Sequence, residues 1–184
     1  MSDAALLVID AQESFRHRPF FVADDLPAYL AAQNRLIAGA KAAGMKVVQI
    51  FHLADEGPFS KASGHVRSLD GLVIAPDAVF EKRRHSALVG TGLDVWLTQQ
   101  GVRRLIVSGV RTEQCCETTT RHASDLGWSV DFCTPATLTF PMTGADGRVW
   151  SAAEIAASVE LALTQRFARI VDVDMALGVK AQAA

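Results

Sequence analysis

The residue with the clearest chemical potential is Cys115, which lies in the stretch 105–120, LIVSGVRTEQCCETTT. An apolar run there stops at a glycine and the cysteine follows shortly after, a pattern that predicts a strand, a sharp turn and a helix. With Thr112 as the helix N-cap, Cys115 falls in the first turn, where free backbone N–H groups and the helix dipole favour a thiolate nucleophile. The same N–H groups suit a developing oxyanion. The alternative is a packing residue, because cysteine is among the most frequently buried residue types.

Two further chemical groups stand at the ends of other apolar runs. Asp10 follows the run Ala4–Ile9, and Lys82 closes the run Ala78–Lys82. Ligands of an open parallel sheet bind beyond the carboxyl ends of its strands, so we expect both side chains to meet Cys115 there. A carboxylate can accept the thiol proton, and a nearby ammonium favours both anions. Singly, Asp10 also fits a strand-end cap and Lys82 a solvated base; their coincidence at one rim favours catalysis.

A doubly wound α/β fold would bring these residues together. Strand, helix and strand within the first fifty residues imply a right-handed parallel crossover. The predicted strands are 4–9, 46–51, 78–82, 104–108, 128–133 and 169–173. We therefore predict one domain over residues 1–184, with a six-stranded, mainly parallel sheet and helices on both faces in a Rossmann-like three-layer arrangement.

Helical periodicity and capping signals mark the segments between the strands. The predicted helices cover 24–44, 91–100, the segment from Thr112 to a stop at Gly127, and 151–167. Capping pairs are predicted at their starts, namely Thr91 with Asp94 and Ser151 with Glu154. The segments 52–70 and 135–148 are predicted loops, Cys133 is predicted to lie in the core, and a flexible tail is expected from about residue 180.

Length and composition favour one well-buried domain, with 184 residues, 49% hydrophobic and 21% charged. The formal net charge is −2 and no basic run exceeds three residues, which argues against a nucleic-acid or anionic-membrane partner. No signal region or membrane span is apparent at the N-terminus. Three cysteines, two of them adjacent, match neither a disulfide framework nor a zinc ribbon. We expect a cytoplasmic protein that acts on a small-molecule substrate.

Three motifs carry a resemblance to a known family. They are LLVIDAQESF with Asp10, EKRRHSALVGTGLDVWL with Lys82 and GVRTEQCCETT with Cys115. Over essentially its whole length the chain resembles the isochorismatase-like cysteine hydrolases, which include nicotinamidases, N-carbamoylsarcosine amidohydrolase and ureidoacrylate or biuret hydrolases. The third motif is the most specific, since it matches the family spacing Gly-Val-x-Thr-x-x-Cys between a strand and a helix.

The resemblance implies a role for each motif residue. Cys115 would be the nucleophile, Asp10 the proton acceptor and donor, and Lys82 their electrostatic partner, with no organic cofactor. A cis peptide between Val110 and Arg111 would turn the N–H groups of Arg111 and Cys115 into an oxyanion hole. The adjacent Cys116, where the family usually has valine, is interpreted as packing. The expected reaction is hydrolysis of a small amide, ureide or related C–N bond through a covalent acyl-enzyme.

The chain departs from the family's metal-dependent branch after the second predicted strand. Nicotinamidases bind a metal there through an Asp-x-His motif, whereas this chain reads Ile50-Phe51-His52. Zinc needs three or four ligands, and His52 with His65 does not supply them. We therefore predict no metal site and a protein outside the nicotinamidase branch.

Specificity is expected to come from rim residues, namely Phe15, Arg111, the loop 52–70 and the segment 135–148. We predict that Phe15, His52, His85 and Arg111 face the substrate, with core or surface positions as the alternative for the two histidines. Arg111 either meets an anionic group of the substrate or lies at the surface. Because members of the family commonly form dimers or larger assemblies, the resemblance also implies a homo-oligomer.

Two other function classes remain open. One is ether hydrolysis of the isochorismatase type, since a fold does not determine its function. The other is a thiol-redox or binding protein on the same fold, using the adjacent thiols of Cys115 and Cys116.

Overall fold

A six-stranded sheet forms the centre of the computed structural model, which describes residues 2–179. The strand order is β3-β2-β1-β4-β5-β8, and every neighbouring pair is parallel. The strands are β1 Ala4–Ile9, β2 Lys46–His52, β3 Ala78–Lys82, β4 Arg104–Val110, β5 Ser129–Leu138 and β8 Arg169–Val171. The predicted doubly wound α/β fold is confirmed, and the bounds of β1 and β3 agree with the prediction.

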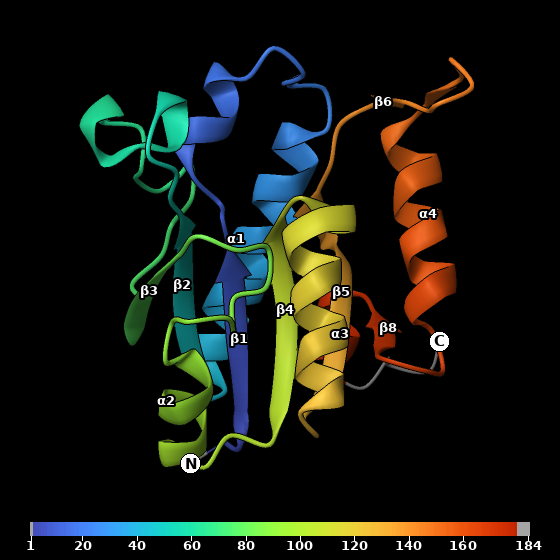
Figure 1. The fold of residues 1–184 in the computed structure, drawn as a ribbon. Coiled ribbons are helices and arrows are strands. Elements are labelled where there is room, and N and C mark those ends of the chain that lie inside the picture. The colour runs from blue at the N-terminus through green and yellow to red at the C-terminus, as the bar shows by residue number, and fades with distance from the viewer. Residues whose placement is uncertain (1, 180–184) are drawn as a thin grey trace.

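Helices cover both faces of the sheet (Figure 1). On one face, α1 Leu26–Ala42 and α5 Val173–Leu177 pack against the core that contains Leu6 and Val8. The other face carries α2 Leu93–Gln99, α3 Glu117–Asp125 and α4 Ala152–Leu163, over a core that contains Leu7 and Ile9. Successive side chains of a strand point to opposite faces, so a central strand such as β1 must be apolar at every position.

The largest departure from the predicted strands is β5, which continues past Cys133 to Leu138. Its register with β4 shifts between Val107 and Gly109, and Pro135 lies within the irregular stretch. A proline lacks the N–H that a regular ladder needs, so it is tolerated where the pairing is interrupted. The predicted loop 135–148 is therefore wrong in its first part. Its second part contains β6, Met142–Thr143, which pairs with β7, Val149–Trp150, in a short antiparallel hairpin.

Helix ends agree with the sequence only where a local signal is strong. The capping box of Ser151 and Glu154 is confirmed at the start of α4. The predicted pair at α2 is wrong, because Gly92 occupies the N-cap and the Thr91 hydroxyl accepts the N–H of Leu93. Helix α4 ends at Leu163 rather than at 167, and α5 was not predicted.

The connections after β1 and β2 lie beyond the carboxyl ends of the strands, at the top of Figure 1. They contain the 3₁₀ turns Glu13–His17, Gly57–Phe59 and Lys61–Ser63. The predicted tail from residue 180 falls outside the described residues. Among residues 2–179, no helix has the length and apolar character that crossing a membrane requires.

Candidate active site

Strand register brings the predicted chemical groups to one edge of the sheet. Ile9 at the end of β1 pairs with Ile50 of β2 and with Gly109 of β4. At the neighbouring strand pair, His52 of β2 lies opposite Lys82 of β3. The residues that follow β1 and β4 therefore meet the ends of β2 and β3 beyond the carboxyl edge, where α/β proteins bind their ligands.

Strand β4 passes very close to β1 at Gly109. A Cβ atom there would lie 1.9 Å from the Ile9 carbonyl oxygen, and the backbone φ is +123°. Glycine has no Cβ and tolerates this conformation, so it permits the close approach. The peptide bond that follows, between Val110 and Arg111, is cis, at the position where the family resemblance places such a bond.

Cys115 lies in a single π-helical turn, Thr112–Cys116, that precedes α3. The N–H groups of Gln114 and Cys116 both donate to the Arg111 carbonyl at 3.2 Å. The predicted N-cap is wrong, because the Thr112 hydroxyl forms a 2.9 Å hydrogen bond with a β5 hydroxyl instead of capping a helix. Cys115 is thus held by an irregular turn and not by the first turn of an α-helix.

The Lys82 ammonium is the centre of the candidate site. Its Nζ lies 2.7 Å from Asp10 Oδ2, 2.9 Å from His52 Nδ1 and 3.2 Å from Cys115 Sγ. An ammonium has three N–H donors, so these three neighbours satisfy it completely. The side chains of Lys82 and Asp10 are fully buried. The structure therefore brings together the three residues to which the sequence assigned chemistry.

Burial sets the protonation of this cluster. It raises the pKa of Asp10, with Lys82 acting in the opposite direction. The pKa of Cys115 is also raised, by burial and then by the Asp10 charge, against the favourable effect of Lys82. Burial lowers the pKa of Lys82, but Asp10 and Cys115 outweigh it and raise the value overall. Burial of the Cys115 thiol therefore opposes the thiolate that a helix N-terminus would favour, and Lys82 offsets part of this effect.

His52 is held as a neutral acceptor for Lys82. Burial, followed by the charges of Lys82 and His85, lowers the pKa of His52 to about 4. A neutral ring can accept the Lys82 proton at Nδ1, which leaves the N–H on Nε2. The side-chain amide of Gln12 forms two hydrogen bonds with the His52 backbone. Its oxygen accepts the His52 N–H at 2.7 Å, and its nitrogen donates to the His52 carbonyl at 3.1 Å. Sequence reasoning missed Gln12. Its position two residues after Asp10, at the same end of β1, is the one signal that could have indicated a role at the site.

The donor atoms of Asp10, His52 and Cys115 lie within 4.8 Å of one another, a spacing that could suit a metal ion. The Lys82 ammonium, however, is within hydrogen-bond distance of all three, so an ion would have to displace a buried positive charge. Ile50 packs in the apolar core and offers no ligand atom. These residues do not fit a metal, and the absence of a metal site stays a prediction.

A cavity of about 340 Å³ opens over the cluster. All four residues predicted to face the substrate, Phe15, His52, His85 and Arg111, line it. His85 Nδ1 lies 3.8 Å from Cys115 Sγ, at the solvent side. Ala54 and Phe59, from the loop 52–70 that was expected to supply specificity, also line the cavity, whereas sequence reasoning missed Arg18, Phe20 and Gln114. Their signal is weak, because they come from loops that only the fold brings together.

The other two cysteines are away from the cavity. Cys116 and Cys133 are fully buried, and none of the three cysteines forms a disulfide. Cys116 belongs to the core beneath α3, and Cys133 to the core on the opposite face. The predicted core position of Cys133 is confirmed.

The fold and the site together define a doubly wound α/β protein with a buried cysteine, aspartate and lysine beyond its strand ends. A family model for the isochorismatase domain matches residues 4–171. The chain belongs to the isochorismatase family, a family of hydrolases, and the family predicted from its motifs is confirmed.

Known relatives include two named enzymes. Nicotinamidase 3 of Arabidopsis thaliana is 44% identical over 75 residues, which are 41% of this chain and 38% of that protein. Streptothricin hydrolase of Streptomyces noursei is 33% identical over 134 residues, 68% of this chain and 46% of that protein. The chain thus aligns with less than half of either enzyme. The first match leaves the predicted exclusion from the nicotinamidase branch unconfirmed.

Solved structures agree over nearly the whole chain. An isochorismatase from Pseudomonas putida superposes with a TM-score of 0.86 at 27% identity, covering 94% of this chain and 89% of that one. The predicted homo-oligomer and cytoplasmic location stay predictions.

Proposed function

We propose that the chain is a cysteine-dependent hydrolase that cleaves a small amide, ureide or related C–N bond through an acyl-enzyme at Cys115. The observation that carries this proposal is the Lys82 ammonium, which lies within 3.2 Å of both the Cys115 sulfur and the Asp10 carboxylate beneath a cavity. The other carboxylate oxygen, Asp10 Oδ1, is buried and has no hydrogen-bond partner among the described residues. A buried, unpaired carboxylate oxygen beside a thiol is suited to accept its proton.

Acylation begins with the thiol, the form of Cys115 that burial favours. As the sulfur attacks the substrate carbonyl carbon, its proton passes to Asp10 and a C–S bond forms. The carbonyl electron pair moves onto oxygen as an oxyanion. Among residues 2–179, no acceptor takes the backbone N–H of Arg111, which is therefore available to the oxyanion. Asp10 then returns its proton to the leaving nitrogen as the C–N bond breaks.

Deacylation repeats these transfers with water. Asp10 accepts a proton from the water molecule while the water oxygen bonds to the thioester carbon. The C–S bond breaks, the carboxylic acid leaves, and the Asp10 proton returns to Cys115. Throughout the cycle Lys82 remains charged, and it stabilises whichever of its two neighbours is the anion.

The relatives support the bond class and not the substrate. Nicotinamidase 3 is named for an amide and streptothricin hydrolase for hydrolysis of streptothricin, and each aligns only in part. A panel of small amides and ureides, assayed by ammonia release, tests the proposal with Cys115→Ala and the matched control Cys116→Ala. We expect turnover by the wild type and by Cys116→Ala, and none by Cys115→Ala. Full activity in Cys115→Ala would contradict the proposal.

Ether hydrolysis is separated from this reaction by its products. A substrate consumed without ammonia or amine release, and without any change in Cys115→Ala, would favour the isochorismatase-type alternative. Activity lost equally in both cysteine variants under peroxide would instead favour a thiol-redox role for the adjacent pair.

A further inference from the structure

The cavity over Cys115 carries an excess of positive charge that the proposed reaction does not use. Its lining includes two guanidinium groups, Arg18 and Arg111, of which Arg111 is paired with Glu113, and one acid, Asp10, which Lys82 already neutralises. His52 is held neutral by its lowered pKa. A cavity with this balance favours an anionic ligand.

Arg111 is the better placed of the two arginines. Its side chain is 8% exposed, and its guanidinium lies 4.8 Å from the Phe20 ring centre and 5.7 Å from that of Phe140. Aromatic faces stabilise a cation but supply no hydrogen-bond acceptors. A desolvated guanidinium therefore still needs acceptors for its N–H groups.

The protein satisfies this need only in part. Glu113 Oε1 lies 2.8 Å from Arg111 Nη2, close enough for an ion pair. Even so, Nε and Nη2 of Arg111 and Oε1 of Glu113 are buried without an aligned hydrogen-bond partner among the described residues. The second Glu113 oxygen is occupied by the Thr139 hydroxyl at 2.5 Å. Arg111 thus keeps donor capacity and lines the cavity, while Nε and Nη2 themselves are buried from solvent.

We infer that Arg111 binds a carboxylate of the substrate, so that the substrate class is a small amide or ureide that also carries a carboxylate. The planar guanidinium fork matches the two oxygens of a carboxylate, which a point charge does not. The bound carboxylate would sit against Phe20 while the scissile carbonyl faces Cys115. This inference rests on the proposed function for the reacting bond, but anion binding itself does not require turnover.

Matched pairs of substrates test the inference directly. Malonamate, succinamate and glutaramate each carry a carboxylate where the corresponding diamide carries a neutral amide. The series varies the separation between the reacting carbonyl carbon and the carboxylate by one methylene group at a time. We expect the wild type to prefer at least one acid over its diamide by about 30-fold in kcat/KM.

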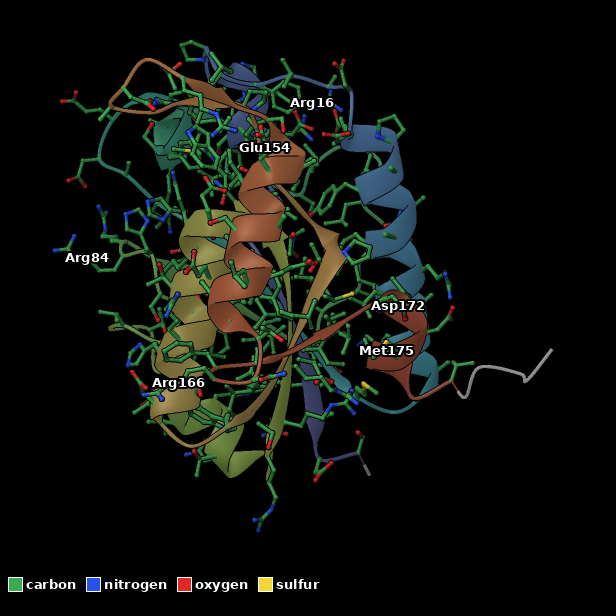
Figure 2. The ribbon with its side chains drawn as sticks, turned by 90° about the vertical axis from the view of Figure 1, so that its right-hand side faces the viewer. Arg16, Arg84, Glu154, Arg166, Asp172 and Met175 are labelled. Carbon is green, nitrogen blue, oxygen red and sulfur yellow. The ribbon has the colours of Figure 1, made fainter. Side chains whose placement is uncertain are left out.

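Variants locate the preference. Arg111→Gln should abolish the acid preference, so that kcat/KM falls far more for the acid than for the diamide, and Arg111→Lys should restore only part of the preference. Arg84→Gln is the matched control, because Arg84 points away from the body of the protein (Figure 2) and does not line the cavity. An equal loss for acid and diamide in Arg111→Gln would overturn the inference in favour of a structural role.

A binding measurement separates this inference from the proposed function. Succinate should slow alkylation of Cys115 by iodoacetamide, and succinamide at the same concentration should not. Arg111→Gln should lose the protection, with circular dichroism and urea unfolding confirming that it folds. Protection without turnover of any amide would sustain the anion site while the proposed reaction fails. Equal protection by succinate and succinamide would overturn the anion site.

Discussion

Lys82 Nζ lies 2.7 Å from Asp10 Oδ2, and neither side chain is exposed. A fully buried ion pair depends on both partners, because loss of one leaves the other charged in a medium of low polarity. The pair also connects two strands that are not neighbours, since Asp10 follows β1 while Lys82 ends β3, two strands away. Stability and chemistry are therefore coupled at this site.

Replacing the lysine should be costly for the fold as well as for activity. We expect Lys82→Met to lower the free energy of unfolding by about 3–5 kcal/mol, since Asp10 is left buried and unpaired. Urea unfolding at pH 7 measures this. The control is Lys61→Met, which removes an exposed pair with Glu81 and should cost less than about 1 kcal/mol. The double variant with Asp10→Asn should lose less stability than Lys82→Met alone; an equal or greater loss would contradict the coupling.

Cys115 should react as a protonated thiol in the absence of substrate. Because burial and Asp10 raise its pKa, its alkylation by iodoacetamide should keep accelerating as the pH rises to 9. Lys82 opposes that rise, so Lys82→Met should slow alkylation further at every pH. Mass spectrometry of the modified peptide measures the rate. An alkylation rate that already reaches its plateau near pH 6 would mean that Cys115 rests as a thiolate, and it would contradict the protonated thiol.

His52 should make the protein sensitive to acid. Its pKa in the fold is about 4, below the ordinary value of 6.5, so the unfolded chain binds the proton first as pH falls. The corresponding stability is present above pH 6.5 and is lost as the pH drops towards 4. In His52→Asn this contribution is absent, so the variant should lose less stability than the wild type between pH 6.5 and 4.5. Parallel slopes in urea unfolding would argue against a neutral, buried His52.

Gly109 should tolerate no side chain. A Cβ atom would lie 1.9 Å from the Ile9 carbonyl oxygen, and neither strand can retreat from the sheet. We expect Gly109→Ala to accumulate as insoluble protein or to unfold at far lower urea than the wild type. Gly90→Ala is the matched control: φ there is +69° and nothing lies within 4 Å, so the cost should be about 1–2 kcal/mol. Equal stability of the two variants would contradict the close approach of β4 to β1.

Much of the fold is predictable because its signals are local. The fully apolar run Ala4–Ile9 reads as a strand covered on both faces, and it is one. The capping box at α4 is equally local. The segment after Val171 was missed, although Asp172 caps α5 through the Met175 N–H and Gly178 ends it. A five-residue helix is too short for its periodicity to stand out.

The site was predictable in its chemistry and not in its environment. Asp10, Lys82 and Cys115 each follow or end a strand, and topology then brings them together. The π-helical turn at Cys115 has no sequence signal, so the predicted position of Cys115 in the first turn of an α-helix was wrong, while its ionisation stays a prediction. The packing of Arg111 against two aromatic rings depends on Phe20 and Phe140, which come from segments distant in the sequence.

The central claim is that Cys115 forms a covalent acyl intermediate. Its most direct test is intact-mass spectrometry of protein quenched during turnover of an amide substrate, followed by peptide mapping. The account predicts a mass increase equal to the acyl group, located on Cys115, retained in Cys116→Ala and absent in Cys115→Ala. Turnover of the same substrate with no adduct on Cys115, and with undiminished activity in Cys115→Ala, would contradict it.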